Sequence, residues 1–247
     1  MASTEFDIGV GTTTASTVAN SLLSSPLTTE GTSCLKVIES TNSFVVWYRA
    51  ALKSSVTSGR YVGVPSTKTI SLRARLRRTA HTAGVPAQFA VGLYCKGIAA
   101  DLASVAPLKD GSDQCYAVWL GDFDADGQAA PATHGVRFGK RKVGGILTGD
   151  TLVQSHAVDS WIGVRLDVSA SGADDAIAVY VDVTGGETWG TAVHTATIVA
   201  ADARKLPWGG TDQLGFFMCG AMNNSLPRGT ANANISTYIE TFRAVVE

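Results

Sequence analysis

The acidic run Asp122-Phe-Asp-Ala-Asp-Gly127 is the sharpest local signal for chemistry in this sequence of 247 residues. Carboxylates at alternate positions wrap one hard cation, and Gly127 permits the tight turn that such a loop needs. The run therefore predicts a Ca²⁺ site with Asp122, Asp124 and Asp126 as ligands. The pattern departs from the helical calcium loop, because its twelfth position is Thr133 instead of a bidentate Glu. The alternative is an acidic hairpin loop without metal, in which three close carboxylates would repel one another.

Arginine recurs at every second position in one short stretch, at Arg73, Arg75 and Arg77. In an extended strand these side chains share one face of a sheet. Guanidinium forks bind carboxylates bidentately, so the stretch predicts a protein interface with acidic partners. The alternative is an ordinary solvated outer face. Nucleic acid is not expected, because it would need more basic charge and interleaved aromatic residues.

Trp208 lies in the glycine-rich stretch Pro-Trp-Gly-Gly, which is typical of a loop. A loop tryptophan offers a flat apolar face and one N–H donor, the combination that stacks on a sugar ring. We predict a glycan contact at Trp208, with Asn223 and Asn224 as polar partners. The alternative is that Trp208 packs beneath its own loop.

Catalytic signatures are sparse. Glycosidases place two carboxylates close together across the scissile bond, and a tight strand motif is one way to do so. No two of the six glutamates of this chain share a strand, and Glu240 stands alone on the last one. The four histidines are scattered, and no nucleophile-elbow, metalloprotease or phosphate-loop motif is present. The sequence therefore predicts a protein that is not an enzyme.

Regular alternation of apolar and polar residues defines the elements that would position these groups. From Ile70 to Arg77 the apolar and polar side chains take opposite faces, as in a half-buried strand. Trp161–Val168 and Ala176–Val183 form the strongest hairpin, joined by the polar stretch 169–175. Many short antiparallel strands with turns between them predict an all-β, two-sheet antiparallel sandwich.

The first 33 residues differ from the rest. Seventeen of them are Ser, Thr or Gly, so this stretch alone buries too little apolar surface to offset its ordering entropy. We therefore expect residues 1–33 to form an N-terminal arm or tail, which in an assembly becomes ordered on a partner. Residues 34–247 are expected to form one sandwich domain.

Charge and hydropathy exclude some classes of partner and some targeting segments. The net charge is −1 and only 17% of residues are charged, so no attraction to nucleic acid or to an anionic membrane is expected. The opening residues show no basic and apolar signal-peptide pattern, and no apolar run approaches the roughly 20 residues of a membrane span. The four cysteines form no Cys-x-x-Cys pair, so we expect free thiols.

Four stretches together resemble the concanavalin A-like jelly roll, in particular its laminin-G and pentraxin-like branch. The resemblance covers most of the chain from residue 34 onward, and the hairpin is its best part. It implies two antiparallel sheets of six or seven strands, neighbouring termini, and binding loops along one rim. The stretches are Cys34–Ile38, Ile70–Arg77, Trp161–Val183 and Ile239–Val246.

Domains of this kind occur in lectins, adhesins, glycosidases and bacteriophage particles. The polar arm and the small-residue composition resemble those of a phage virion protein. The expected function is a structural component of a phage head, tail or fibre, assembled with other virion proteins and with copies of itself. The alternative is a lectin-like module that binds host-surface glycans and in which Ca²⁺ takes part.

Overall fold

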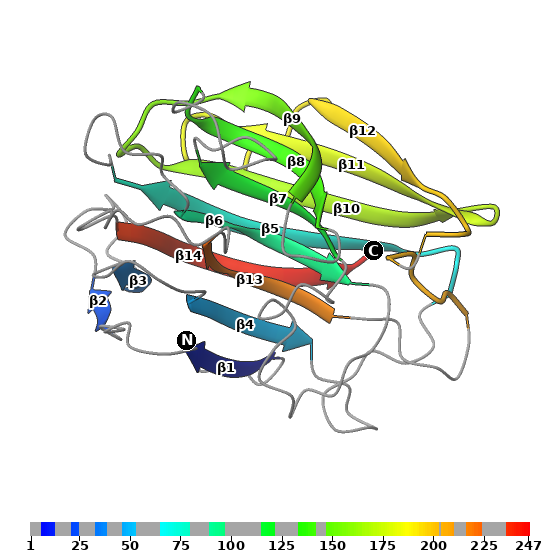
Figure 1. Cartoon of the computed structure of the whole chain (residues 1–247), viewed down its shortest axis with the longest axis horizontal. Coiled ribbons are helices and arrows are strands. Elements are labelled where there is room, and N and C mark those ends of the chain that lie inside the picture. Colours follow the sequence, from blue (N-terminus) through cyan, green and yellow to red (C-terminus); the bar gives the residue numbers. More distant parts are fainter. Residues whose placement is uncertain are drawn as a thin grey trace.

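Two antiparallel β-sheets face each other across an apolar core, and the described part of the chain contains no helix (Figure 1). The predicted all-β sandwich is thereby confirmed. The computed structural model describes residues 6–12, 21–24, 33–38, 46–52, 65–79, 89–96, 115–121, 133–141, 147–202, 204–209, 216–223 and 236–247.

The larger sheet has seven strands in the order β12-β11-β10-β5-β14-β3-β2. Strand β14 therefore lies between β5 and β3, although it is the last in sequence. In the order of the sheet the strands span His194–Ile198, Asp174–Asp182, Ile162–Ser171, Thr69–Arg78, Ser236–Val246, Ser33–Ile38 and Ser21–Ser24.

The facing sheet has five strands in the order β13-β6-β7-β8-β9. A two-stranded sheet of β1 and β4 lies beside β13 and continues the layer formed by the five-stranded sheet (Figure 1). The five strands span Phe216–Asn223, Phe89–Lys96, Cys115–Gly121, Gly135–Arg141 and Leu147–Ser155, and the two further strands span Phe6–Thr12 and Val46–Leu52.

Strand β5 shows how the sequence pattern produces the sandwich. Its even-numbered apolar side chains, such as Leu72 and Leu76, are fully buried, and they belong to the core between the sheets. The odd-numbered residues of the strand lie on the outer face, since side chains alternate along a strand. Each fully buried Leu, Ile or Val contributes about 1.5–3 kcal/mol, so the alternation fixes which face turns inward. The predicted split of the strand into two faces is confirmed.

The hairpin of β10 and β11 is longer than the sequence indicates. Ser169, Ala170 and Ser171 continue the ladder, and Ser171 pairs with Asp174. The expected seven-residue loop is therefore wrong, and a two-residue turn replaces it. Gly172, the first turn residue, has a φ of 61°, the positive value that a type II′ turn requires at that position.

Residues 1–33 contribute strands to the structure. Strand β1 pairs with β4, and β2 pairs with β3 at one end of the seven-stranded sheet. Whether this segment behaves as an arm on a partner stays a prediction. In the described ranges, no helix is long and apolar enough to cross a membrane.

Candidate ligand-binding face

Charged residues gather on the outer face of the seven-stranded sheet. The registers of β5, β10 and β11 place Arg73 opposite Arg165, and Arg165 opposite Tyr180. Ser71 lies opposite Asp167 in the next outward-facing row. The outer face of these strands therefore carries rows of neighbouring polar side chains, whereas the inner face is apolar.

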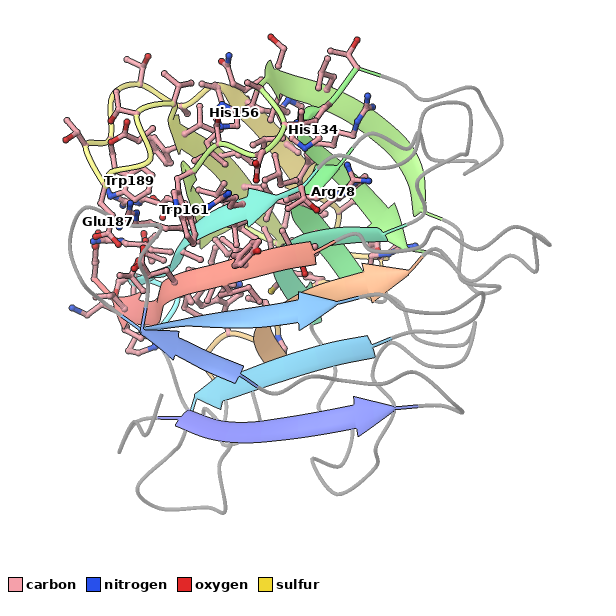
Figure 2. The ribbon with its side chains drawn as sticks, turned by 90° about the vertical axis from the view of Figure 1, so that its left-hand side faces the viewer. Arg78, His134, His156, Trp161, Glu187 and Trp189 are labelled. Atoms are coloured by element: carbon pink, nitrogen blue, oxygen red, sulfur yellow. The ribbon has the colours of Figure 1, made fainter. Side chains whose placement is uncertain are left out.

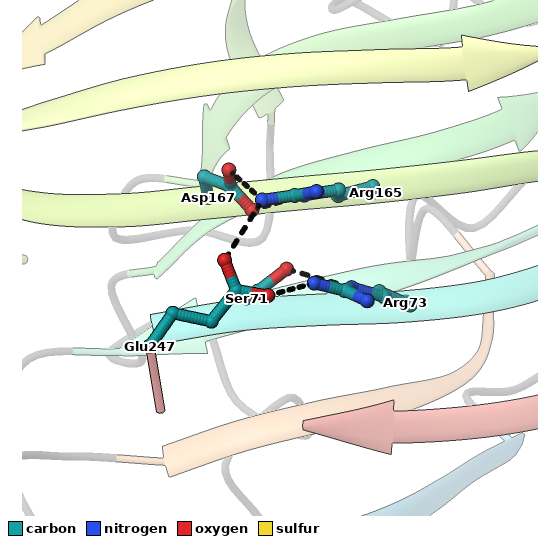
Figure 3. A network of polar contacts seen from close by, with 5 residues as sticks. All are labelled: Ser71, Arg73, Arg165, Asp167 and Glu247. Carbon is teal, nitrogen blue, oxygen red and sulfur yellow. Dashed lines mark hydrogen bonds and ion pairs between the residues drawn. The ribbon is translucent and has the colours of Figure 1, made fainter. Parts of the chain in front are cut away.

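Two arginines and two carboxylates form one connected network on this face (Figure 3). Arg165 donates to both carboxylate oxygens of Asp167, from Nε to Oδ1 and from Nη2 to Oδ2, each at 2.7 Å. The Nη2 of Arg165 also donates to Oε2 of Glu247 at 3.3 Å, and the Nη2 of Arg73 donates to Oε1 of the same carboxylate. Ser71 Oγ accepts a hydrogen bond of 3.0 Å from Arg73 Nε.

Glu247 separates two like charges that the register brings together. Its backbone N–H donates to the Thr69 carbonyl at 2.9 Å, and the Thr69 N–H donates back at 3.1 Å. This pairing directs the Glu247 side chain onto the outer face, beside Arg73 and Arg165. Like charges directly opposite on adjacent strands repel, and the shared carboxylate offsets that repulsion. The hydrogen bond to Asp167 is the largest influence raising the pKa of Arg165.

A groove of about 440 Å³ lies next to this network, on the outer face of β10, β11 and β12. Its lining is made of small apolar residues and of side chains that carry hydroxyl groups, with one carboxylate at Asp167. The volume falls within the range of small-molecule sites in proteins. The lining residues are Thr69, Asp167, Ser169, Ala176, Ile177, Ala178, Tyr180, Thr195, Ala196 and Thr197.

Arginine side chains lie over aromatic rings on the same face. The guanidinium carbon of Arg165 is 5.0 Å from the ring centre of Tyr180, which also lines the groove. Arg75 lies over Trp161 at 5.3 Å. These distances are within cation–π range, so the rings hold the arginine side chains flat against the sheet.

The arginines that were predicted to form an interface meet acidic residues of their own chain. Arg75 pairs with buried Glu240 at 2.6 Å, and Arg77 pairs with Asp159 at 2.6 Å. Arg73 pairs with Glu247, as described above. The carboxylates that these arginines meet in the structure therefore belong to the chain itself, whereas the sequence pattern predicted them on a partner protein. A role of these residues in binding another protein stays a prediction.

The loop after β11 is ordered by one aspartate. Asp182 accepts hydrogen bonds from the Thr184 N–H at 3.0 Å, the Thr184 hydroxyl at 2.6 Å and the Thr188 N–H at 2.8 Å. Burial alone would raise the pKa of Asp182, but these hydrogen bonds and the charge of Arg75 outweigh it and lower the pKa. The carboxylate therefore stays ionised and fixes the loop.

The same loop carries Glu187 and Trp189, which lie at the same end of the molecule as Trp161 (Figure 2). The Thr241 hydroxyl donates to Glu187 Oε1 at 3.2 Å. Thr241 has a φ of 52°, next to a register irregularity in β14. Positive φ is unfavourable for a β-branched residue, so this bulge holds strained backbone.

Trp208 is held from two sides. Its Nε1–H donates to Oδ1 of buried Asp175 at 2.6 Å, and its ring packs against the core. The indole donor is therefore already used within the chain, which agrees with the loop-packing alternative. The glycan contact at Trp208 stays a prediction. For its expected partners, only the backbone of Asn223 is described, in β13, and Asn224 lies outside the described residues.

The predicted calcium ligands Asp122, Asp124 and Asp126 also lie outside the described residues. Among the residues that the structure does describe, no group of three or more His, Cys, Asp or Glu side chains is placed to hold a metal ion. The Ca²⁺ site therefore stays a prediction.

Sequence reasoning missed the network of Arg165, Asp167 and Glu247. The signal was present, because residues two apart on a strand share a face and Arg165 and Asp167 both alternate with buried neighbours. The contribution of Glu247 had no local signal. It depends on the pairing of β14 with β5, which joins residues far apart in sequence.

No model of a protein family matches this chain, and no curated protein matches it in sequence. Solved structures do match its fold. One is the marine PL-14 alginate lyase from Aplysia kurodai, with a TM-score of 0.52, 12% identity, and coverage of 87% of this chain and 84% of that one. Another is a seed lectin of Lotus tetragonolobus, with a TM-score of 0.52, 9% identity, and coverage of 100% and 95%.

A third is the basic lectin of winged bean, solved with Tn-antigen, with a TM-score of 0.50, 14% identity, and coverage of 98% of this chain and 92% of that one. At these identities the likeness concerns the fold, which agrees with the predicted concanavalin A-like jelly roll. A virion role has no support among these matches.

The prediction that the chain is not an enzyme is contradicted by the match to the alginate lyase. That prediction was drawn from scattered histidines and the lack of a glutamate pair. A lyase on the same fold shows that the pattern of a glycosidase is not the only one to look for.

Proposed function

We propose that this chain binds a saccharide in the groove on the outer face of β10, β11 and β12. The observation that carries the proposal is the lining of that groove, which combines hydroxyl groups, three alanines and one carboxylate. Saccharides present many hydroxyl groups and a weakly apolar ring. A site for them needs convergent polar groups beside an apolar surface.

The sheet provides this lining by its register. Asp167, Ala178 and Thr195 lie side by side on β10, β11 and β12. In the next row Ser169, Ala176 and Thr197 repeat the same order of polar, small and polar side chains. Two rows with small central residues leave room for a ring between hydroxyl-bearing edges.

Asp167 is held in place for such a role. Its two oxygens accept hydrogen bonds from Arg165, so its orientation is fixed before a ligand arrives. A carboxylate has four lone-pair sites and retains acceptor capacity for ligand hydroxyl groups. A preorganised acceptor binds a ligand with less loss of side-chain entropy.

The matches to two lectins with TM-scores of 0.50 and 0.52 support the proposal at the level of fold only. The virion structural role expected from the sequence lacks comparable support. Residence in a virion, like association with other copies of the chain, stays an untested prediction.

The test is binding of the purified chain to a glycan array, followed by affinity measurement for the best ligand. Ala178→Phe fills the groove and should lower that affinity by about tenfold or more, since it replaces ligand volume with a ring. Ala157→Phe is the matched control, because Ala157 is exposed in the loop between β9 and β10. The control should keep the wild-type affinity.

Two results would contradict the proposal. One is a chain that binds no glycan although circular dichroism shows it folded. The other is a glycan that binds the Ala178→Phe variant and wild type equally, which would move the site away from the groove.

A further inference from the structure

Arg73 and Arg165 bind the Glu247 carboxylate between them in the way that they could bind the carboxylate of a ligand. Each guanidinium donates from Nη2 to a different oxygen of Glu247. The two arginines come from adjacent antiparallel strands and lie directly opposite each other. Two facing guanidinium groups that share one carboxylate are the arrangement by which proteins bind anionic groups.

Each of the two arginines also has a partner other than Glu247. Arg165 is fixed by Asp167 on one side and by the ring of Tyr180 at 5.0 Å on the other. Arg73 is fixed by the Ser71 hydroxyl at 3.0 Å. Both side chains are 17% exposed, so they are largely packed against the sheet. These contacts would continue to hold both side chains against the sheet if the Glu247 carboxylate moved away, and an external anion would then take its place between the two positive charges.

The Glu247 carboxylate is the least buried member of the network. Its side chain is 44% exposed, against 11% for Asp167. Ion pairs at that exposure are weak, because water competes for both partners. A long side chain with one weakly held end exchanges readily with an external anion.

The charges of the network favour such an exchange. Two guanidinium groups face two carboxylates, so the network is neutral while Glu247 is in place. When Glu247 leaves, one positive charge remains between Arg73 and Arg165. A monovalent anionic group restores neutrality at the same two donors.

We propose that Arg73 and Arg165 form an anion site that takes the carboxylate or sulfate group of an external ligand in place of Glu247. Glu247 is then an internal competitor that occupies the site when no ligand is present. The site borders the saccharide groove through Asp167 and Tyr180 but does not depend on the saccharide proposal.

The test compares wild type with Glu247→Gln, which removes the competing charge and keeps the shape of the side chain. Titration with sodium acetate and sodium sulfate, followed by NMR of the Arg73 and Arg165 Nε–H signals, gives the dissociation constants. An internal competitor that occupies the site about nine times in ten weakens binding about tenfold. Glu247→Gln should therefore bind both anions about tenfold more tightly.

Asp159→Asn is the matched control. It also adds one positive charge to the same face, by removing the carboxylate that pairs with Arg77 at 2.6 Å. It should change the affinity at Arg73 and Arg165 by less than about twofold, because its partner lies elsewhere on β5. An equal gain in both variants would overturn the proposal, since it would reflect overall charge. An affinity of Glu247→Gln no higher than that of wild type would overturn it too.

Arg73→Gln tests the site from the other side. It should abolish the gain in the Glu247→Gln background, with thermal unfolding to show that the chain remains folded. Full retention of the gain would overturn the assignment to this pair.

Glucuronate and glucose then identify the source of the anion. Tighter binding of glucuronate than of acetate, with no shift of the two arginine signals by glucose, supports an acidic sugar at the site. Equal binding of glucuronate and acetate supports a free anion. Glucose shifting both signals as strongly as glucuronate would overturn a site for an anionic group.

Discussion

Asp175 fastens the segment around Leu206 and Trp208 to the end of the β10–β11 hairpin. Its fully buried carboxylate accepts the Leu206 N–H at 2.7 Å and the Trp208 Nε1–H at 2.6 Å. Burial raises the pKa of Asp175, and the two hydrogen bonds offset that rise only in part. Two replacements of Asp175, one by Ala and one by Asn, therefore distinguish the stabilisation by the hydrogen bonds from the destabilisation by the buried charge.

Asp175→Ala should lower the free energy of unfolding by about 2–4 kcal/mol, because it leaves the buried Leu206 N–H without an acceptor, at about 1–3 kcal/mol, and removes the partly buried bond of the Trp208 Nε1–H, at about 1 kcal/mol. Asp175→Asn keeps one acceptor oxygen and removes the buried charge. Its cost should be about 1–2 kcal/mol near neutral pH, since one donor loses its acceptor while the desolvation penalty disappears.

The pH dependence of the Asn variant follows from the raised pKa. The folded chain binds the Asp175 proton more tightly than the unfolded chain, whose pKa stays near the ordinary value of 3.8. The stability contributed by this carboxyl is complete below that value and is lost as the pH rises through the folded pKa. Wild type should therefore lose stability relative to Asp175→Asn as the pH rises above the ordinary value of 3.8 and through the raised folded pKa.

Urea unfolding of both variants and wild type, followed by far-ultraviolet circular dichroism at several pH values, measures these differences. Groups remote from residue 175 titrate alike in the three proteins, so their contributions cancel in the difference. A difference between wild type and Asp175→Asn that stays constant with pH would refute the assigned cause of the pKa shift. An Asp175→Ala variant as stable as Asp175→Asn would refute the role of the hydrogen bonds.

Two further substitutions test the outer face. Gly163→Ala would place its new Cβ 2.1 Å from the Gly186 carbonyl oxygen, so we expect a clearly lower melting temperature, whereas Gly190→Ala meets no atom within 4 Å and should melt like wild type. Equal melting temperatures would show that the loop after β11 does not pack on β10. Glu240→Gln removes the buried negative charge that pairs with Arg75 at 2.6 Å and should lower the free energy of unfolding by about 3 kcal/mol, measured by urea unfolding. A cost below about 1 kcal/mol would contradict a stabilising role of the charge of Glu240 in this buried pair.

Local patterns predicted the strands better than the turns. The alternation in β5 gave the correct buried face, because burial of one face fixes the register of a strand. The hairpin loop was predicted too long, because Ala170 and Asp174 have low strand propensity. Cross-strand pairing and the positive φ of Gly172 override that propensity in the folded chain.

The candidate site was predictable only in part. The arginines of β5 were identified, but their carboxylate partners come from segments distant in sequence. Glu240 lies in the last strand, and Glu247 directly follows it. Spacing along a sequence does not reveal which strands become neighbours. The negative conclusion about catalysis was wrong for a related reason, since it assumed one arrangement of acidic groups for the whole fold.

The place of β14 between β3 and β5 has a consequence for biogenesis. While a ribosome is still making the chain, β3 and β5 each present an open hydrogen-bonding edge, and only residues 236–246 close both gaps. Contacts of such long sequence separation slow the search for the native state. Nascent chains that stall before that strand should pair with one another and require a chaperone.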